Sequence, residues 1–591
     1  MTPLAHAGRA VAGATGVLLL LVPVLWHLDP WRVLSSSANM EQFATTELTL
    51  ALVYVFLSRL RADTRHMRTL TLLLAAIVAA VVGFMMVRHY GSATAHFILP
   101  TPRNIALALA LAGLTLTACW AASGAHFGIL VGGFLLLGYG MQFAGGTIAS
   151  PPISLERYAL YLTFGGEGFL GNALRVISDV VVVYIGFGVV VNLIGATRVI
   201  ETIAILATRR SRGAAIKVAV LSSALFGTIS GSATSNVMTS GTFSIASMRK
   251  LGLTGAQAGG VEAVASTLGQ VIPPIMGAAA FLMADFTGLP YLTIAGAAML
   301  PALLCVMVLF FCAGRMAASV DLNAGPPVAD APKLERKDLF FLLPILGVFV
   351  TLVMRSDNVA LAGVSGMAMG LVAGVLRNGL TETVQQFRAL PSRAGRAIGN
   401  LVVTASALGC IMAVLSITGF DVLLSMKIGH LGETSLFLSL LLSGLAAIIL
   451  GTGMATSGVY IVVAIMLAPG LVKLGIPVLA AHMFVFYFSV ISMITPPVAF
   501  AVLAASGLTG AGFYRTAFAA LRFGWVLFSM PFLIVYFPGL LLIGSVGEIL
   551  RDLFSVLAIG VVIWLAFKAS RIVIGAMRRN APVKPEPDQF W

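Results

Sequence analysis

One unusual pattern occurs twice in this 591-residue chain and limits what the chain can fold into. Glycines and hydroxyl residues interrupt apolar sequence at 227–236 and 451–458, and each run is followed by a Pro-Pro pair, at 273–274 and 496–497. The spacing between run and pair is kept to within one residue. Because glycine and proline interrupt helices, each copy predicts two helix breaks. Inside a bilayer, such breaks are tolerated only where protein or a cavity surrounds the freed backbone.

The composition places these breaks in a membrane. The chain is 59% hydrophobic and only 10% charged, whereas soluble domains carry about 25% charged residues. Apolar runs recur at about the 20-residue length that spans a bilayer as a helix. They are continuous rather than alternating, which excludes a β-barrel. The net charge of +14 comes from basic residues in short loops, which predicts cytoplasmic loops and a cytoplasmic N-terminus rather than a nucleic-acid partner.

The distribution of apolar runs predicts an all-α polytopic membrane protein in four units. The first contains four spans without glycine-hydroxyl breaks and is predicted to be a scaffold that faces the lipid bilayer. The next two each contain one copy of the repeat, and a proline-rich, charged connection at 313–337 separates them. The last is an extra helix with a cytoplasmic tail. The predicted boundaries are 1–122, 123–330, 331–545 and 546–591.

Paired broken helices in corresponding halves indicate the binding site of a secondary transporter. Backbone carbonyls and hydroxyls are hard ligands that suit Na⁺, and freed N–H groups at half-helix N-termini attract carboxylates. The alternatives are close helix packing for the small residues and plain kinks for the prolines, but the matched repetition favours a site. The predicted substrate- and ion-binding residues are Ser230, Gly231, Ser232, Thr234, Asn236, Thr267, Gln270, Pro273, Gly453, Thr456, Ser457, Ser492, Thr495 and Pro496.

Two acidic residues inside apolar helices are candidate proton carriers, because an ionisable residue in a membrane helix suggests a function. Glu262 precedes Gln270 on one helix, and Asp179 lies in another. Asp179 is four residues from Arg175, a spacing that favours a structural ion pair.

Signatures of enzymes and bound cofactors are missing from the sequence. It contains neither the nucleotide-binding pattern G-x-x-x-x-G-K-[ST] nor HExxH, and its four cysteines are scattered singly. We therefore predict no enzyme activity, no cofactor and no metal site beyond a coupling ion. Energy is expected to come from a gradient of Na⁺ or H⁺.

Longer stretches around the repeats carry a family resemblance. The sequence at 221–233, 261–280, 484–488 and 494–499 resembles the fused permease of tripartite ATP-independent periplasmic (TRAP) transporters, and the TAXI branch in particular. The resemblance covers roughly 125–545, and the first four helices are similar only in layout to the small subunit of that family.

The resemblance implies an elevator-type transporter of the bacterial inner membrane, with inverted repeats and two re-entrant helical hairpins. It also implies a periplasmic binding protein that delivers a small organic acid, typically a carboxylate. A carrier that works without a binding protein is the close alternative, and a channel or an intramembrane enzyme is the more distant one.

Two departures from the family pattern fall in the second copy. Ala455 stands where the family usually has proline, and Met493 where it has asparagine. An asparagine carbonyl can bind an ion, whereas methionine is a poor ligand. The first copy is therefore predicted to be the better-formed site.

Overall fold

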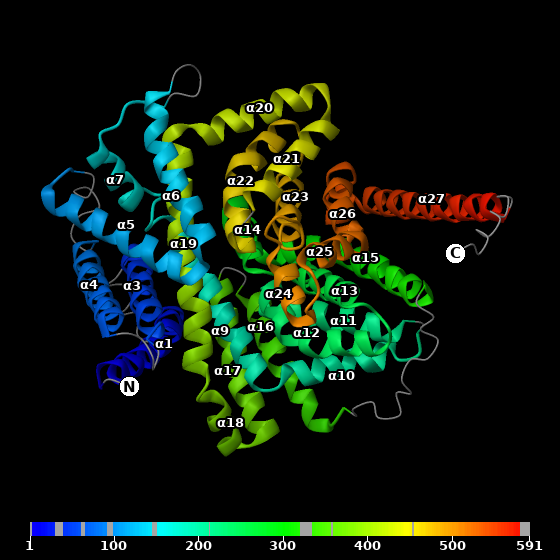
Figure 1. Cartoon of the computed structure of the whole chain (residues 1–591), viewed down its shortest axis with the longest axis horizontal. Coiled ribbons are helices and arrows are strands. Elements are labelled where there is room, and N and C mark those ends of the chain that lie inside the picture. Colours follow the sequence, from blue (N-terminus) through cyan, green and yellow to red (C-terminus); the bar gives the residue numbers. More distant parts are fainter. Residues whose placement is uncertain are drawn as a thin grey trace, which may run out of the picture.

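The computed structural model describes residues 3–29, 39–60, 66–90, 99–144, 150–211, 213–319, 334–355, 358–451 and 454–579 (Figure 1). These ranges are helical and contain no strand, which confirms the predicted all-α membrane fold. By length and composition, nine of the described helices can cross a membrane. The predicted span at 43–59 forms helix α3 (Met40–Ser58) but is not one of the nine, because Glu41, Gln42 and Glu47 lower its hydropathy.

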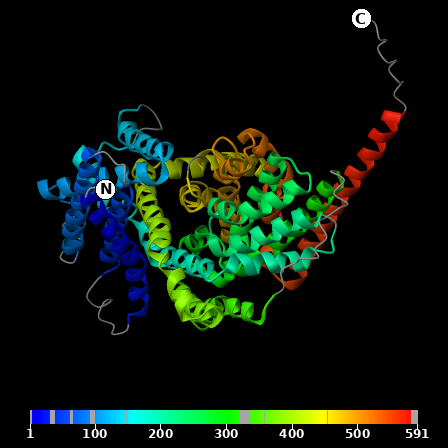
Figure 2. The same cartoon turned by 60° about the horizontal axis from the view of Figure 1, so that its bottom comes forward.

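The N-terminal unit is a group of four helices packed on one long helix. Helices α1, α3 and α5 contact α19 (Leu390–Thr418), and α4 packs against α3. At the contact between α1 and α19, a Cβ on Gly395 would lie 2.8 Å from the Cα of Gly16, so glycine permits this approach. In both views these helices lie on one side of α19, and residues 196–319 and 436–536 lie on the other (Figures 1 and 2). The bounds are α1 (Pro3–Leu28), α3, α4 (His66–Tyr90) and α5 (Pro102–Ser123).

The rest of the chain repeats one order of elements. A helix ends at a glycine in the left-handed region, Gly195 (φ +93) or Gly419 (φ +67), and a connecting helix follows. Then come a hairpin of two helices and a helix broken at the Pro-Pro pair. The first repeat is α9 (Val182–Leu193), α10 (Ala196–Thr208), α11 (Ala214–Ser230), α12 (Ala233–Lys250), α13 (Gly255–Leu268), η4 (Gly269–Val271), α14 (Ala278–Thr287) and α15 (Tyr291–Ser319). The second is α19, α20 (Phe420–Thr434), α21 (Leu436–Leu450), α22 (Thr456–Lys473), α23 (Val478–Ile491), α24 (Phe500–Thr509), α25 (Phe513–Phe523) and α26 (Trp525–Tyr536).

The breaks lie where the sequence predicts them. Helix α11 ends at Gly231, whose φ of +63 suits glycine, and Ser232 caps the start of α12. After each Pro-Pro pair a backbone hydrogen bond closes the loop, Gly277 N to Gln270 O at 2.7 Å and Ala501 N to Met493 O at 3.0 Å. The helices before and after each Pro-Pro pair, α13 and α14 in the first repeat and α23 and α24 in the second, are each too short to cross a bilayer alone.

The two repeats interleave rather than lie side by side. Helix α14, from the first repeat, packs against α22 and α23 of the second. Helix α24, from the second repeat, packs against α12 and α13 of the first. In Figure 1 the first hairpin lies below the second, with α14 beside α22 and α24 beside α12. Each broken helix thus joins the two halves into one packed unit.

The remaining helices connect or flank the repeats. Helix α6 (Ala125–Gly140) and helix α7 (Leu155–Phe164) lead to α8 (Asn172–Val176), which continues through a π-helical turn, η3 (Ile177–Val181), into α9. Between the repeats lie η6 (Arg336–Phe341), α16 (Leu342–Met354), α17 (Val359–Asn378) and α18 (Leu380–Phe387). After η7 (Pro538–Leu541), α27 (Val546–Arg579) projects away from the other helices (Figure 2). The predicted tail beyond 579 lies outside the described residues.

Candidate functional site

A cavity of about 480 Å³ lies where the tips of the two hairpins face helices α9 and α19. The hairpins and the Pro-Pro breaks supply one wall, and α5, α6, α9 and α19 supply the other. Its polar lining residues are Ser123, Asn192, Ser230, Ser232, Thr234, Ser235, Gln270, Asn400, Thr404, Thr456 and Ser457. The predicted site residues of the two copies, which are far apart in the sequence, therefore meet at one place.

The tip of the first hairpin presents both a hydroxyl and backbone groups to the cavity. The Ser232 hydroxyl accepts a hydrogen bond from the N–H of Ser235 at 3.4 Å, and so caps α12. The hydroxyl of Ser230 is buried and makes no hydrogen bond within the described part of the chain. Gly231 and Thr234 complete this part of the lining. All four residues belong to the predicted site.

The tip of the second hairpin is less polar. Thr456 and Ser457 line the cavity as predicted, together with Met454 and Ala455. Ala455 occupies the N-cap position of α22 and offers no side-chain cap, so the first N–H groups of that helix remain available. The predicted residue Gly453 lies outside the described residues.

The first Pro-Pro break brings two unpaired oxygen atoms close to the tip of the first hairpin. Gln270 lines the cavity, and its Oε1 is buried without a hydrogen-bond partner among the described residues. The buried Thr267 hydroxyl, three residues earlier and outside the lining, is likewise unpaired there. With Ser230, these atoms make three unsatisfied buried oxygens in the first copy, and buried oxygens of this kind usually have a partner.

The predicted residues at the second break lie outside the cavity lining. The Ser492 hydroxyl donates to Ser489 O at 2.7 Å and the Thr495 hydroxyl to Ile491 O at 2.9 Å, so both are satisfied within their own helical turns. Neither they nor Pro496 line the cavity, whereas Met493 does. Ser and Thr hydroxyls in a helix commonly donate to the backbone carbonyl one turn earlier. This explains why these two side chains point toward their own helix and away from the cavity.

Two predicted residues of the first copy also lie behind the cavity rather than in it. The Asn236 amide nitrogen donates to Ser223 O at 2.6 Å, which ties α12 to α11. Pro273 is buried beneath the break. Neither residue lines the cavity, and their role as binding residues stays a prediction.

Sequence reasoning missed the opposite wall. The hydroxyls of Ser123 on α5 and Thr404 on α19 are 2.7 Å apart, and Asn192 and Asn400 lie on α9 and α19. The two asparagines are isolated amides within apolar helices, and this was the signal available. Polar residues in such positions are costly and often line a functional pathway.

The cavity carries no ionised side chain among its described lining residues. Its charge comes from backbone instead. Helices α12 and α22 begin at the cavity with their partly positive N-termini, and α11 ends there with its partly negative C-terminus. The cavity can therefore hold an anion and a cation next to each other without a fixed charge of its own.

The acidic candidates lie elsewhere. Glu262 is completely buried between α11, α12 and α13, and does not line the cavity. The predicted Arg175–Asp179 pair is wrong. Arg175 pairs with Glu41 at 3.4 Å, and the Asp179 carboxylate lies 3.3 Å from His27 Nε2. The π-helical turn that contains Asp179 changes the angular spacing along the helix, so the i, i+4 rule does not apply.

A polytopic α-helical protein whose paired broken helices enclose a cavity is a secondary transporter in architecture. Residues 105–549 match the DctM component of the tripartite ATP-independent periplasmic transporters. The chain is also 27% identical over 337 residues to the C4-dicarboxylate TRAP transporter large permease protein DctM of Pseudomonas aeruginosa, a match that covers 55% of this chain and 76% of that relative. The chain belongs to the TRAP transporter permease family. This confirms the family predicted from the sequence, and the TAXI branch stays a prediction.

Proposed function

We propose that the protein imports a small carboxylate across the bacterial inner membrane, driven by a gradient of Na⁺ or H⁺ and supplied by a periplasmic binding protein. The observation that carries this proposal is the cavity between the two hairpin tips, whose described lining residues include no ionised side chain. Helix N-termini from both repeats meet at this cavity and are suited to a carboxylate.

The lack of fixed charge also supports ion coupling. Placing an anion in a buried site without a compensating charge costs several kcal/mol or more. Partial charges at two helix N-termini offset part of this cost, and a cation bound with the substrate offsets the rest. The unpaired oxygens of Ser230, Thr267 and Gln270 supply hard ligands for such a cation at the first copy.

The first substrate to test is a C4-dicarboxylate. The relative in Pseudomonas aeruginosa is a C4-dicarboxylate permease, and the polar groups of this cavity come from both walls, as a ligand with two carboxylates requires. Succinate is therefore the probe of choice.

The arrangement of the repeats supports an elevator movement. The cavity lies at the boundary between the interleaved hairpin unit and a wall built on α9 and α19. Connecting helices α10 and α20 join wall to hairpin in both repeats, and each begins at a left-handed glycine, Gly195 and Gly419. Such positions absorb large changes of backbone angle. We propose that the hairpin unit moves while α19 and the N-terminal helices stay fixed, with the N-terminus cytoplasmic.

Reconstituted liposomes test the proposal. Labelled succinate should accumulate only when its cognate binding protein is added outside and an ion gradient is imposed. Accumulation without the binding protein would instead support the stand-alone carrier. Equilibration without accumulation would contradict coupled transport and support a channel.

A further inference from the structure

Glu262 lies in a cluster of hydroxyls behind the first hairpin. Its side chain is completely buried in α13. Its Oε1 accepts hydrogen bonds from Ser223 of α11 at 2.7 Å, Ser240 of α12 at 2.7 Å and Ser266 of α13 at 3.1 Å. Ser244 of α12 donates to Oε2. One carboxylate thus binds three helices, including both arms of the hairpin.

The cluster contains more oxygen atoms that can accept a hydrogen bond than hydroxyl hydrogens that can donate one. The Ser240 hydroxyl has one hydrogen but faces four oxygens: Ser223 Oγ at 3.0 Å, Asn236 O and Oδ1 at 2.9 Å each, and Glu262 Oε1. The Asn236 amide nitrogen donates to Ser223 O, which places Oδ1 toward Ser240. One additional hydrogen would therefore find an acceptor. The oxygens already stand at hydrogen-bond distance from one another.

No cation neutralises this carboxylate within the described part of the chain. The ionisable group on the facing helix α10 is another acid, Glu201. Burial is the main cause that raises the pKa of Glu201, and the negative charge of Glu262 raises it further. Arg249, at the end of α12, is exposed and reaches Thr509 O. The other charged residues on the helices packed around the cluster are exposed or half-buried and make no ion pair with Glu262: Arg198, Lys217, Lys250, Arg315, Arg515 and Arg522. His482, on α23, contacts Tyr460 at 2.8 Å.

A polar stripe connects the cluster to the cavity. Ser232, Asn236, Ser240 and Ser244 are spaced by four residues and therefore share one face of α12. Ser232 lines the cavity, and Ser240 and Ser244 contact Glu262. One face of α12 therefore reaches both the cavity and Glu262.

We propose that Glu262 takes up and releases one proton during each transport cycle, and that this step couples the first hairpin to the proton gradient. The carboxylate gains a proton from water on the more acidic side and becomes a carboxylic acid, and the same O–H bond breaks when the proton passes to water on the other side. The neutral acid retains its hydroxyl partners and lets the hairpin move without a buried charge, which is costly inside a bilayer. This inference rests on the proposed function and assigns its coupling ion.

Infrared difference spectroscopy of the full chain in lipid nanodiscs tests the titration without any substrate. Lowering the pH should produce the carbonyl band of a protonated carboxylic acid that is absent from Glu262→Gln. Glu262→Asp should retain the band at a shifted frequency, and Glu201→Gln should also retain the band. A wild-type spectrum without the band, or a band that persists in Glu262→Gln, would overturn the inference even if succinate is transported.

Transport in liposomes tests the coupling. One proton per substrate across a gradient of one pH unit supports about tenfold accumulation. Glu262→Gln should lose this accumulation but retain exchange of internal for external succinate, since exchange needs no net proton movement. Glu201→Gln should keep both. Tenfold accumulation by Glu262→Gln would overturn the inference while leaving the proposed function intact. If the wild type fails to transport succinate, the substrate proposal fails, and the infrared result still decides the role of Glu262.

Discussion

Among the described residues, hydroxyl side chains and no charged ones line the cavity at the two hairpin tips. Ser232 and Thr456 occupy these tips, one at the start of α12 and the other at the start of α22. A hydrogen bond to a charged ligand is worth about 1.5–3 kcal/mol. Ser232→Ala and Thr456→Val are therefore each expected to weaken substrate binding roughly tenfold or more. Uptake rates at low succinate concentration measure this loss.

A matched control separates binding from folding. Ser154 caps α7 through Arg157 N at 3.4 Å, as Ser232 caps α12, but it does not line the cavity. Both Ser→Ala variants lose a cap worth about 1 kcal/mol, so their expression should fall by similar amounts. Only Ser232→Ala should reduce uptake per molecule. Equal uptake by the two variants would mean that Ser232 serves packing alone.

The sequence predicted which residues lie near the breaks, but it did not predict where all of their side chains point. The predictions of Ser230, Ser232 and Thr456 depended on the breaks themselves and agree with the cavity. Ser492 and Thr495 were predicted from proximity to prolines, but their hydroxyls bond to carbonyls one turn back. Which way a hydroxyl turns depends on three-dimensional surroundings that residue order does not contain.

The helices of each hairpin approach the neighbouring break closely enough to require glycine. A Cβ on Gly227 of α11 would lie 2.6 Å from the Cα of Gly269, which precedes the first Pro-Pro pair. In the second repeat, a Cβ on Gly451 would lie 2.8 Å from that of Ser492. The same contact therefore recurs in both repeats and holds each tip beside its break.

Gly227→Ala is expected to push α11 away from the break. Overpacking of this kind costs about 1–3 kcal/mol, and the melting temperature of the purified protein should fall with succinate uptake. Gly113→Ala is the control, because nothing lies within 4 Å of a Cβ at that position of α5. This variant should be neutral or slightly stabilised. Normal stability and uptake for Gly227→Ala would contradict the close contact.

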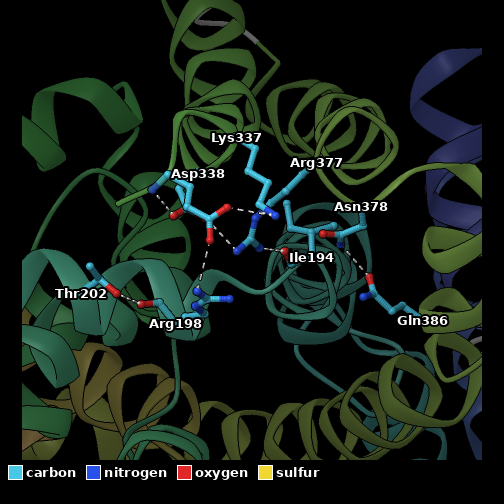
Figure 3. A network of polar contacts seen from close by, with 9 residues as sticks. Ile194, Arg198, Thr202, Lys337, Asp338, Arg377, Asn378 and Gln386 are labelled. Carbon is cyan, nitrogen blue, oxygen red and sulfur yellow. Dashed lines mark hydrogen bonds and ion pairs between the residues drawn. The ribbon is translucent and has the colours of Figure 1, made fainter. Parts of the chain in front are cut away.

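A buried ion pair fixes the connection between α9, η6 and α17. Arg377 pairs with Asp338 at 2.9 Å, and both side chains are less than 10% exposed (Figure 3). Arg377 also donates to Ile194 O, next to the left-handed Gly195. Removing one partner of such a pair costs about 3–5 kcal/mol. Arg377→Met alone should therefore lower thermal stability strongly.

The double variant Arg377→Met/Asp338→Leu tests the reason for that loss. It removes the unpaired charge and should recover much of the stability, since apolar replacements of buried pairs are often neutral. A double variant that is less stable than Arg377→Met would show that the contact to Ile194 O, rather than the ion pair, dominates.

Local sequence chemistry predicts where helices end, but it does not predict which helices pack against each other. The break at Gly231 was predictable because glycine and serine stop a helix wherever it lies. The π-helical turn at Ile177–Val181 has no comparable sequence signal. The exchange of α14 and α24 between repeats depends on contacts between residues far apart in the chain. Periodicity and turn chemistry do not specify such contacts.

For the molecule as a whole, interleaving packs the two repeats into one unit. Helix α14 brings this unit into contact with α8, where the Asn172 amide donates to the Asp285 carboxylate of α14 at 3.1 Å. Asn172 belongs to the segment that continues into α9, and α14 packs on α22 and α23. This hydrogen bond therefore joins the two parts that the elevator proposal moves apart.

Linking these two positions should stop transport in the present state. In Asn172→Cys/Asp285→Cys, a short dithiol-specific crosslinker is expected to abolish succinate accumulation, and reductive cleavage of the linker should restore it. The native cysteines interfere little, because Cys119, Cys305 and Cys410 are buried and Cys312 is half-buried. Each single variant treated in the same way controls for modification without a link. If the crosslinked double variant transports as fast as the single variants, α14 does not move relative to α8, and the elevator proposal fails.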